Sequence, residues 1–350
     1  MENKDVLLRV ENLRQYFKTG KNDFKAVDDI SFEIKKGEVF GLVGESGCGK
    51  TTTGRSIIKL YTPTGGNVYY NGERISSGLR DYKERIASYR HEMKSADAAG
   101  REKLKKLIDK EKKALNEAVL TNKKHKTVTD IQMIFQDPIA SLNPRMTVRE
   151  IIAEGLIIQG VRDKKLIDEK VYSILETVGL VREHAGRYPH EFSGGQRQRI
   201  GIARAIIMNP GLIIADEPIS ALDVSIQAQV INLLNDLREK MDLTILFIAH
   251  DLSVVKYFSD RIAVMYFGKI VELADSEELF GHPLHPYTKS LLSAIPYPDP
   301  HYEKKRKRKV YNPEEEHDYS EEGPKLREIA PGHFVSCNSV EFKRYKKEIH

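Results

Sequence analysis

Eight consecutive residues near the start of the chain have the composition of a phosphate-binding loop. The segment Gly44-Glu45-Ser46-Gly47-Cys48-Gly49-Lys50-Thr51 fits the spacing G-x-x-x-x-G-K-[ST] and directly follows an apolar run over residues 39–43. Glycines let backbone N–H groups turn inward around a phosphate, and a helix that begins there adds the positive end of its dipole. Lys50 is suited to the β- and γ-phosphates and Thr51 to Mg²⁺. We expect residues 44–51, with Thr52, to bind ATP.

A second chemical element lies far downstream, where the apolar segment 212–215 ends in two acids, Asp216 and Glu217. Two carboxylates at the end of a buried strand are costly unless they have a use. Asp216 suits Mg²⁺, directly or through a water molecule. Glu217 suits the general base that activates or orients a water for attack on the γ-phosphate.

The third element is the run Phe192-Ser193-Gly194-Gly195-Gln196 before a helical pattern. It resembles the signature motif of the ABC ATPases, most commonly LSGGQ, with Phe192 in place of Leu. A Ser-Gly-Gly at a helix start offers N–H groups and a hydroxyl to a phosphate. The resemblance implies that Ser193, Gly194, Gly195 and Gln196 contact a nucleotide held mainly by a partner subunit.

Three further positions match motifs of the family, and all the motifs occur in the family's order along the chain. Gln136, after the strand-like run 131–135, resembles the Q-loop glutamine that senses Mg²⁺ and the attacking water. The segment Ser220-Ala221-Leu222-Asp223 resembles the D-loop, with Asp223 on the partner's side. His250 resembles the switch histidine that contacts the γ-phosphate. The resemblance therefore implies Glu217, His250 and Gln136 as catalytic residues, and Thr51, Gln136 and Asp216 as Mg²⁺ ligands.

An aromatic ring near the start of such chains stacks on adenine. Phe17 and Tyr16 both qualify, and counting from the strand-like segment 7–10 favours Phe17. An aromatic residue there is equally compatible with a core position.

The resemblance narrows to the ATPases of oligopeptide and dipeptide importers, most closely to the F-type member of their heterodimeric pair. Three segments carry it: residues 44–55, residues 188–199 and residues 221–230. Residues 285–296, His-Pro-Tyr-Thr-Lys-Ser-Leu-Leu-Ser-Ala-Ile-Pro, resemble the start of that subfamily's C-terminal extension. An importer ATPase for another substrate, such as nickel, remains an alternative.

The chain has two cysteines, Cys48 and Cys337. Many members of the subfamily carry several cysteines near the C-terminus that hold an iron–sulfur centre. A [4Fe–4S] centre needs four thiolates, so we expect no iron–sulfur cluster. Cys48 lies at a helix start two residues before Lys50, and both features favour a thiolate that is reactive when the site is empty. The alternative is that Cys48 is a small, sterically sheltered residue that the loop tolerates.

The alternation of strand-like and helical segments that must position these residues indicates an α/β fold, and the resemblance implies a P-loop NTPase of ABC type with a RecA-like core. A mostly parallel sheet is indicated by four strand-like segments, 39–43, 131–135, 212–215 and 244–248. An antiparallel β-subdomain is indicated by the segments 7–10, 30–34 and 67–70, with Asn71-Gly72 as a turn. We expect an ABC nucleotide-binding domain at 1–275, which includes an inserted helical hairpin at 78–127 and a helical signature subdomain at 137–210. Within the hairpin, the helical spacing of apolar residues is interrupted and resumes after Ala99-Gly100. The C-terminal extension is expected at 276–350.

Composition bounds the cellular setting. The chain has 350 residues and no apolar run long enough to span a bilayer. Its net charge is +5, and we expect this charge to be distributed along the whole chain. No apolar leader begins it, and two cysteines fit a reducing compartment. These features predict a cytoplasmic protein, and the resemblance implies a peripheral position on the cytoplasmic face of the cell membrane.

The resemblance also implies partners: a paralogous ATPase subunit in a heterodimer, two membrane permease subunits, reached through residues 137–145, and indirectly an extracellular substrate-binding protein. No nucleic acid is expected. A remote alternative is a soluble ABC ATPase acting on DNA, suggested by the coiled-coil-like insertion.

Overall fold

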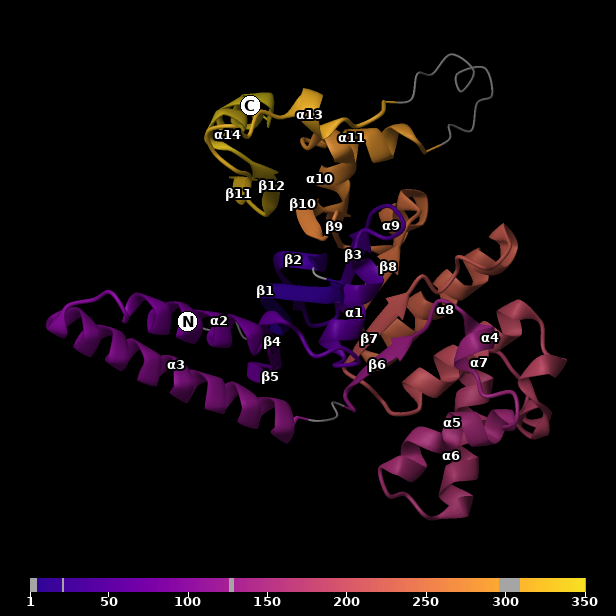
Figure 1. Cartoon of the computed structure of the whole chain (residues 1–350). Helices are drawn as coiled ribbons and strands as arrows, with labels where there is room; N and C mark the ends of the chain where they lie inside the picture. The colour runs from indigo at the N-terminus through magenta and orange to yellow at the C-terminus, as the bar shows by residue number, and fades with distance from the viewer. Residues whose placement is uncertain (1–4, 21, 126–128, 296–308, 350) are drawn as a thin grey trace. The chain divides into compact units, whose positions relative to one another are not determined.

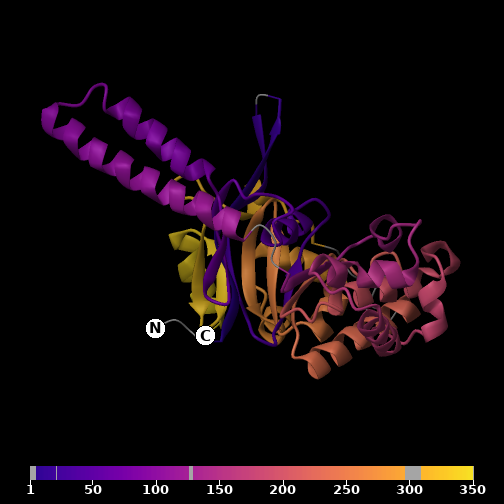
Figure 2. The ribbon, with the colours of Figure 1, turned by 90° about the horizontal axis from the view of Figure 1, so that it is seen from below.

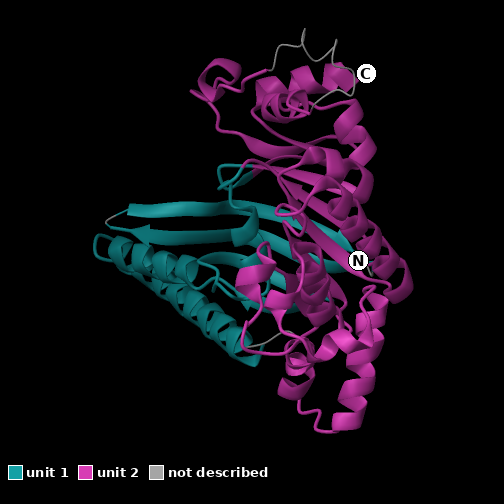
Figure 3. Cartoon of the chain, turned by 90° about the vertical axis from the view of Figure 1, so that its right-hand side faces the viewer, with its two compact units in different colours: residues 1–35, 46–128, 266–269 teal, residues 36–45, 129–265, 270–350 magenta. Residues whose placement is uncertain are grey.

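The computed structural model describes residues 5–20, 22–125, 129–295 and 309–349, which fall into two compact units. Unit 1 comprises residues 1–35, 46–128 and 266–269, and unit 2 comprises residues 36–45, 129–265 and 270–350, as coloured in Figure 3. The phosphate-binding loop crosses the boundary, because Glu45 is in unit 2 and Ser46 in unit 1.

Unit 1 contains the expected antiparallel sheet, with strand order β2-β1-β4-β5. Its strands are β1 (Val6–Thr19), β2 (Asn22–Lys35), β4 (Gly65–Tyr70) and β5 (Glu73–Ser77). Asn71 and Gly72 have φ values of 49° and 78°, which confirms the predicted turn between β4 and β5. Helix α1 (Lys50–Ile57) also belongs to this unit.

The insertion in unit 1 is a pair of antiparallel helices, α2 (Arg80–Glu92) and α3 (Ala98–Lys124), which lie side by side in Figures 1 and 2. Ile86 of α2 and Ile108 and Ala118 of α3 are buried. The break between the two helices was expected at Ala99-Gly100, but it lies a few residues earlier, between Glu92 and Ala98. The Asp97 carboxylate caps α3 by accepting a hydrogen bond from the Gly100 amide at 2.8 Å, so Ala99 and Gly100 lie in the first helical turn.

Unit 2 is built on an eight-stranded sheet with the order β11-β12-β10-β9-β3-β8-β7-β6. Strands β3 (Val39–Val43), β6 (Ile131–Ile134), β7 (Leu212–Asp216), β8 (Thr244–Ala249) and β9 (Arg261–Tyr266) pair in parallel. The predicted core strands are confirmed. Every residue of β3, β7 and β8 is buried, as expected for strands covered on both faces.

The segment 137–210 of unit 2 is mainly helical, as predicted, and further helices follow it. These helices are α4 (Pro138–Ser141), α5 (Val148–Ile158), α6 (Lys164–Thr177), α7 (Gly194–Ile206), α8 (Val224–Met241) and α9 (Leu252–Phe258). Asp137, Thr147, Asp163, Ser193, Asp223 and Asp251 cap their N-termini, so turn-forming polar residues begin each one.

The C-terminal segment adds its own strands to the main sheet. After β10 (Lys269–Asp275) come α10 (Ser276–Gly281), α11 (Pro286–Ser293), α13 (Pro313–Glu316), β11 (Lys325–Ala330), β12 (His333–Cys337) and α14 (Ser339–Ile349). Strand β12 pairs antiparallel with β10, with Glu272 opposite Val335. Among the described residues, no helix has the length and apolarity needed to cross a bilayer.

Candidate functional site

The phosphate-binding loop has the backbone that its glycines permit. Gly44, Gly47 and Gly49 have φ values of 152°, 81° and 109°, a region that residues with side chains rarely occupy. A Cβ added to Gly47 would meet no atom within 4 Å, so the requirement there is conformational and the space beside the loop is open. Gly49 immediately precedes the first residue of α1, whose N-terminal amides therefore begin at the loop. This backbone fits a phosphate group.

Lys50 and Cys48 lie next to each other in the loop. Lys50 is only 3% exposed, and its Nζ lies 3.8 Å from the Cys48 Sγ. The structure favours the alternative of a sheltered residue over a reactive thiolate, because burial raises the pKa of the Cys48 thiol and the nearby Lys50 charge offsets this only in part. Cys48 therefore behaves as a small buried residue of the loop.

The loop has a hydrogen-bond partner that sequence reasoning missed. The backbone amide of Glu45 donates to the hydroxyl oxygen of Tyr287 at 3.1 Å, and both residues belong to unit 2. Tyr287 is 2% exposed and is the second residue of α11. Its only signal in the sequence was its place in the His-Pro-Tyr-Thr run of the C-terminal extension.

The three predicted catalytic residues meet at the carboxyl ends of neighbouring parallel strands. Gln136 follows β6, Glu217 follows β7 and His250 follows β8. The Gln136 Nε2 donates to the Glu217 Oε2 at 3.0 Å, and the His250 Nδ1 lies 3.2 Å from the same oxygen. The sheet thus brings together side chains that are up to 114 positions apart in the sequence numbering.

Glu217 is held in an uncommon backbone conformation, with φ at 45°. A left-handed conformation in a non-glycine residue costs of order 1 kcal/mol and is maintained here by a hydrogen bond from the Glu217 amide to the Ile248 carbonyl at 2.9 Å. Its side chain is 12% exposed, and within the described residues Oε1 makes no hydrogen bond. This carboxylate is therefore placed to accept a proton from, or orient, a water molecule.

The predicted Mg²⁺ ligands are distributed between the units. Asp216 ends β7 and is fully buried, Gln136 contacts Glu217, and Thr51 is the second residue of α1 in unit 1. Hydroxyl, amide and carboxylate oxygens are the donors that Mg²⁺ takes in nucleotide sites, so the residue types fit the ion. The role of these three residues as ligands stays a prediction.

The signature segment begins helix α7 with a reciprocal cap. The Gln196 amide donates to the Ser193 Oγ at 3.3 Å, and the Ser193 amide donates to the Gln196 Oε1 at 3.1 Å. Gly194 and Gly195 lie in the first turn. A Cβ on Gly195 would come within 2.6 Å of the Ile226 Cγ2, whereas one on Gly194 would make an ordinary 3.6 Å contact with Leu222. Gly195 therefore has a packing role inside this chain.

The D-loop residue Asp223 also has an internal contact. It caps α8 by accepting from the Ile226 amide at 3.0 Å and from the Ser225 hydroxyl at 2.7 Å, and the latter bond lowers the pKa of its carboxyl. Ser220 donates from its hydroxyl to the Glu217 carbonyl at 3.1 Å, which ties the D-loop to the residue after β7.

The two adenine candidates differ in their surroundings. The Tyr16 hydroxyl donates to the Asp28 carboxylate, and Lys25 and Arg80 approach its ring with 5.4 Å and 5.8 Å to the centroid. The ring of Phe17 is partly exposed and makes one edge contact, with Tyr61 at 5.3 Å. The hydroxyl and the ring of Tyr16 therefore both have polar or charged neighbours, whereas the ring of Phe17 has fewer such contacts.

The loop after Gln136 is anchored to the signature helix. Arg204 of α7 donates from Nη1 to the Ser141 carbonyl at 2.6 Å, and its guanidinium lies 5.6 Å from the Phe135 ring centroid. Burial removes water from the Arg204 guanidinium and lowers its pKa. The hydrogen bond to the Ser141 carbonyl offsets part of this loss of solvation. Sequence reasoning missed Arg204, since nothing in its spacing distinguishes it from other helix residues.

Comparison with known families gives two matches. Residues 27–114 and 99–220 match the ABC transporter family, and residues 271–323 match the C-terminal region of oligopeptide and dipeptide transporters. The first match includes the phosphate-binding loop, Gln136, the signature segment and Glu217. The second includes Tyr287.

Individual proteins are similar over almost the whole chain. The oligopeptide transport ATP-binding protein OppF of Bacillus subtilis is 55% identical, covering 97% of this chain and 99% of its own length. The dipeptide transport ATP-binding protein DppF of Lactococcus lactis is 48% identical, with 97% of each chain covered. A dimeric structure of the cassette MJ0796 in a post-hydrolysis state with ADP and Pi has a TM-score of 0.58 at 26% identity, covering 77% of this chain and 99% of that one.

Proposed function

This chain belongs to the ABC transporter ATP-binding subunits of the oligopeptide and dipeptide type, and from that premise we propose that it hydrolyses Mg·ATP to drive peptide import. The observation that carries the chemistry is the contact of Gln136 and His250 with one oxygen of Glu217. The homologues carry the substrate class, because their names specify oligopeptide or dipeptide transport.

In the proposed reaction, Glu217 acts on the attacking water. Its carboxylate accepts the water's proton or orients the water in line with the γ-phosphate, and His250 stabilises charge on the phosphate side. When bound, Mg²⁺ neutralises the charge of the phosphates, with Thr51, Asp216 and Gln136 as its proposed protein ligands. Gln136 orients the Glu217 carboxylate through its hydrogen bond to Oε2.

We assign nucleotide binding to residues 44–52 and base stacking to Phe17. The positive-φ glycines and the N-terminus of α1 support the first assignment. The polar contacts of Tyr16 support the second, because a ring whose hydroxyl and face are already engaged is a poorer platform for adenine.

We propose that two ATP sites form between this chain and a paralogous ATPase subunit. Ser193, Gly194, Gly195, Gln196 and Asp223 would face the nucleotide of the partner. The N-terminal amides of α7 support this role, since a 13-residue helix presents donors and a positive dipole end to a phosphate.

Two membrane permease subunits are the proposed recipients of the conformational change, and residues 137–145 the proposed socket. Ile139 in this segment is 63% exposed, an apolar side chain suited to a partner helix. The Arg204 contact with Ser141 links the socket to the signature helix. The chain would then act on the cytoplasmic face of the membrane, and the peptide would be delivered by an extracellular binding protein.

The proposed functional division keeps the expected boundaries: a nucleotide-binding domain at 1–275, with a hairpin at 78–127 and a signature subdomain at 137–210, and an extension at 276–350. The capped helices α4 to α7 support the signature subdomain.

The decisive experiment is complementation. A strain lacking this chain, but retaining the permeases and the paralogous ATPase, should regain uptake of a labelled peptide with the wild-type chain and not with Glu217→Gln. Purified transporter in lipid nanodiscs should hydrolyse ATP in parallel. Restored ATPase activity without peptide uptake would contradict the substrate class, and uptake by the variant would contradict the assigned chemistry.

A further inference from the structure

The inserted hairpin, defined as residues 80–124, concentrates the positive charge of the chain. It has 14 lysines and arginines against 8 aspartates and glutamates, a net charge of +6, whereas the whole chain has +5. The impression from the sequence that charge is spread evenly was therefore wrong. Without the hairpin, the rest of the chain is close to neutral.

Most of this charge lies on α3, whose buried residues are the apolar Ile108 and Ala118. Helix α3 has eight lysines and one arginine but four acids. Lys106 pairs with Glu102 at 3.0 Å and Lys112 with Asp109 at 3.4 Å, at 78% and 50% side-chain exposure for the two lysines. Four more exposed lysines make no ion pair with any described residue: Lys103, Lys105, Lys110 and Lys113. We call these four the lysine face.

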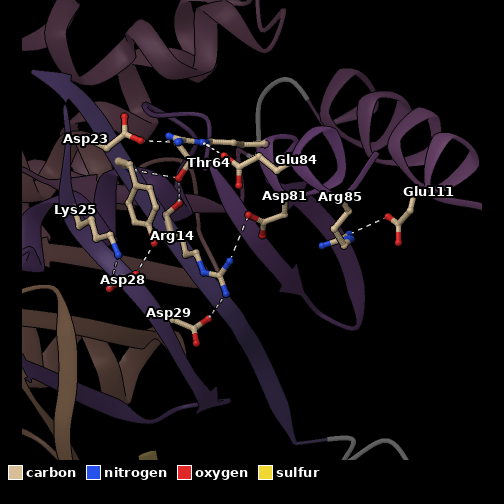
Figure 4. Close-up of polar contacts among 12 residues, drawn as sticks. Arg14, Asp23, Lys25, Asp28, Asp29, Thr64, Asp81, Glu84, Arg85 and Glu111 are labelled. Atoms are coloured by element: carbon tan, nitrogen blue, oxygen red, sulfur yellow. Dashed lines mark hydrogen bonds and ion pairs between the residues drawn. The ribbon is translucent and has the colours of Figure 1, made fainter. Parts of the chain in front are cut away.

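The hairpin is fixed to the sheet of unit 1 at both ends. At the first attachment, Arg80 pairs with Asp23 at 2.5 Å. Figure 4 shows Arg14 in its ion pairs with Asp81 at 3.4 Å and Asp29 at 3.0 Å. At the other end, the side chain of Asn122 donates to the Ser77 carbonyl at 2.8 Å and accepts from the Ser77 amide at 2.9 Å. Arg85 and Glu111 connect the two helices at 3.0 Å. The lysine face is therefore held on a firmly attached arm.

We propose that the lysine face docks on the anionic phospholipid headgroups of the membrane. This inference rests on the proposed function only in placing the subunit beside a bilayer. The charge complementarity is direct, since each lysine near an anionic surface adds favourable electrostatic energy that falls off within about 10 Å. Residues 103 to 113 span about 15 Å of helix, enough to reach several headgroups together.

The composition of α3 favours lipid over nucleic acid. It has no aromatic residue and a single arginine, whereas stacking on bases and bidentate phosphate contacts use aromatic and arginine side chains. Glu102, Asp109 and Glu117 interrupt the positive face and would repel a tightly bound phosphate backbone. A membrane surface, where the headgroups can rearrange around a rigid arm, tolerates such mixed charge.

The test measures binding of the full chain to vesicles of phosphatidylcholine alone or mixed equally with phosphatidylglycerol. The wild type should bind the mixed vesicles, and high salt should weaken this binding. The variant K103Q/K105Q/K110Q/K113Q should bind them on the order of 100-fold more weakly. The matched control K164Q/K165Q/K170Q/K240Q removes four exposed lysines from α6 and α8 and should bind like the wild type.

A second variant, E102Q/D109Q, adds net positive charge to α3 and should bind more tightly, which keeps the test informative if the first variant folds poorly. Equal loss in the control quadruple variant would overturn the proposal, as would wild-type binding that ignores phosphatidylglycerol. Tighter binding of duplex DNA than of vesicles at equal phosphate concentration would also overturn it. ATPase activity is measured without lipid, so a failed proposed function is recognised separately.

Discussion

The hydroxyl of Tyr287 accepts a hydrogen bond from the backbone amide of Glu45 at 3.1 Å, joining two residues that are 242 positions apart. One belongs to the C-terminal extension and the other to the phosphate-binding loop. The extension therefore contributes directly to the conformation of the loop.

Replacement Tyr287→Phe should weaken ATP binding about fivefold, because the loss of one hydrogen bond costs about 1 kcal/mol. The ring remains to fill its buried position. Titration with a fluorescent ATP analogue measures the effect, and Tyr319→Phe, which removes a hydroxyl elsewhere in the extension, is the control. Equal affinity in Tyr287→Phe and wild type would show that the loop does not depend on this bond.

Replacement Glu217→Gln should lower ATP turnover by about 1,000-fold while leaving ATP affinity unchanged, because the amide keeps the shape but loses the basic oxygen. The variant should accumulate as a closed dimer with ATP. Turnover is measured with the partner's own site disabled. Near-wild-type turnover under that condition would remove Glu217 from the catalytic role.

Replacement Gly194→Asp tests the contact with the partner's nucleotide. An added Cβ is tolerated there, so the isolated chain should fold and bind ATP normally, while the new carboxylate should repel the partner's phosphates and abolish ATP-dependent dimerisation. Gly195→Ala is the contrasting variant and should lower the melting temperature, because its Cβ meets Ile226 at 2.6 Å. If Gly194→Asp reduced ATP binding as strongly as Lys50→Ala, the proposed partner contact would be wrong.

His285 predicts how the extension responds to acid. Burial, with the nearby His317 and Lys289, lowers the pKa of His285 from 6.5 to about 3. Between these values the unfolded chain binds a proton that the folded chain does not, so stability falls as pH decreases through 6.5. At pH 5 this contribution amounts to about 2 kcal/mol.

The comparison variant is His285→Asn, whose side-chain oxygen can still accept from the Tyr287 amide as His285 Nδ1 does at 3.2 Å. Its melting temperature should fall less than that of the wild type between pH 7 and pH 5. Parallel curves for the two proteins would show that His285 does not contribute to the acid sensitivity.

Cys48 should react slowly with maleimide in the native chain, because burial raises the pKa of its thiol. Cys337 should also react slowly, since burial raises its pKa to about 11. Both should label rapidly after denaturation, with the sites mapped by mass spectrometry. Rapid labelling of native Cys48 that Mg·ATP slows would restore the hypothesis of a reactive loop thiol.

Short-range pattern was sufficient for most of the fold and for the order of the motifs. The strand β7 and the acids at its end could be predicted because an apolar run followed by two carboxylates is local in sequence. The Tyr287 contact could not, since no local pattern relates α11 to Glu45. The sequence could not decide between a reactive and a sheltered Cys48, because burial depends on tertiary packing and raises the pKa of the thiol more than Lys50 lowers it. The packing of Gly195 against Ile226 was hidden for the same reason.

The pairing of β12 with β10 bears on where this chain can be cut. Strand β10 has five consecutive buried residues and lies between β9 and β12, so ending the chain at Asp275 would expose a long apolar edge. Such edges recruit other strands and promote aggregation. The cut would also remove the Leu284 and His285 amides and the His333 ring, all of which contact the fully buried carboxylate of Glu272. A shortened chain prepared for crystallisation should therefore not end at Asp275 but should retain the C-terminal extension.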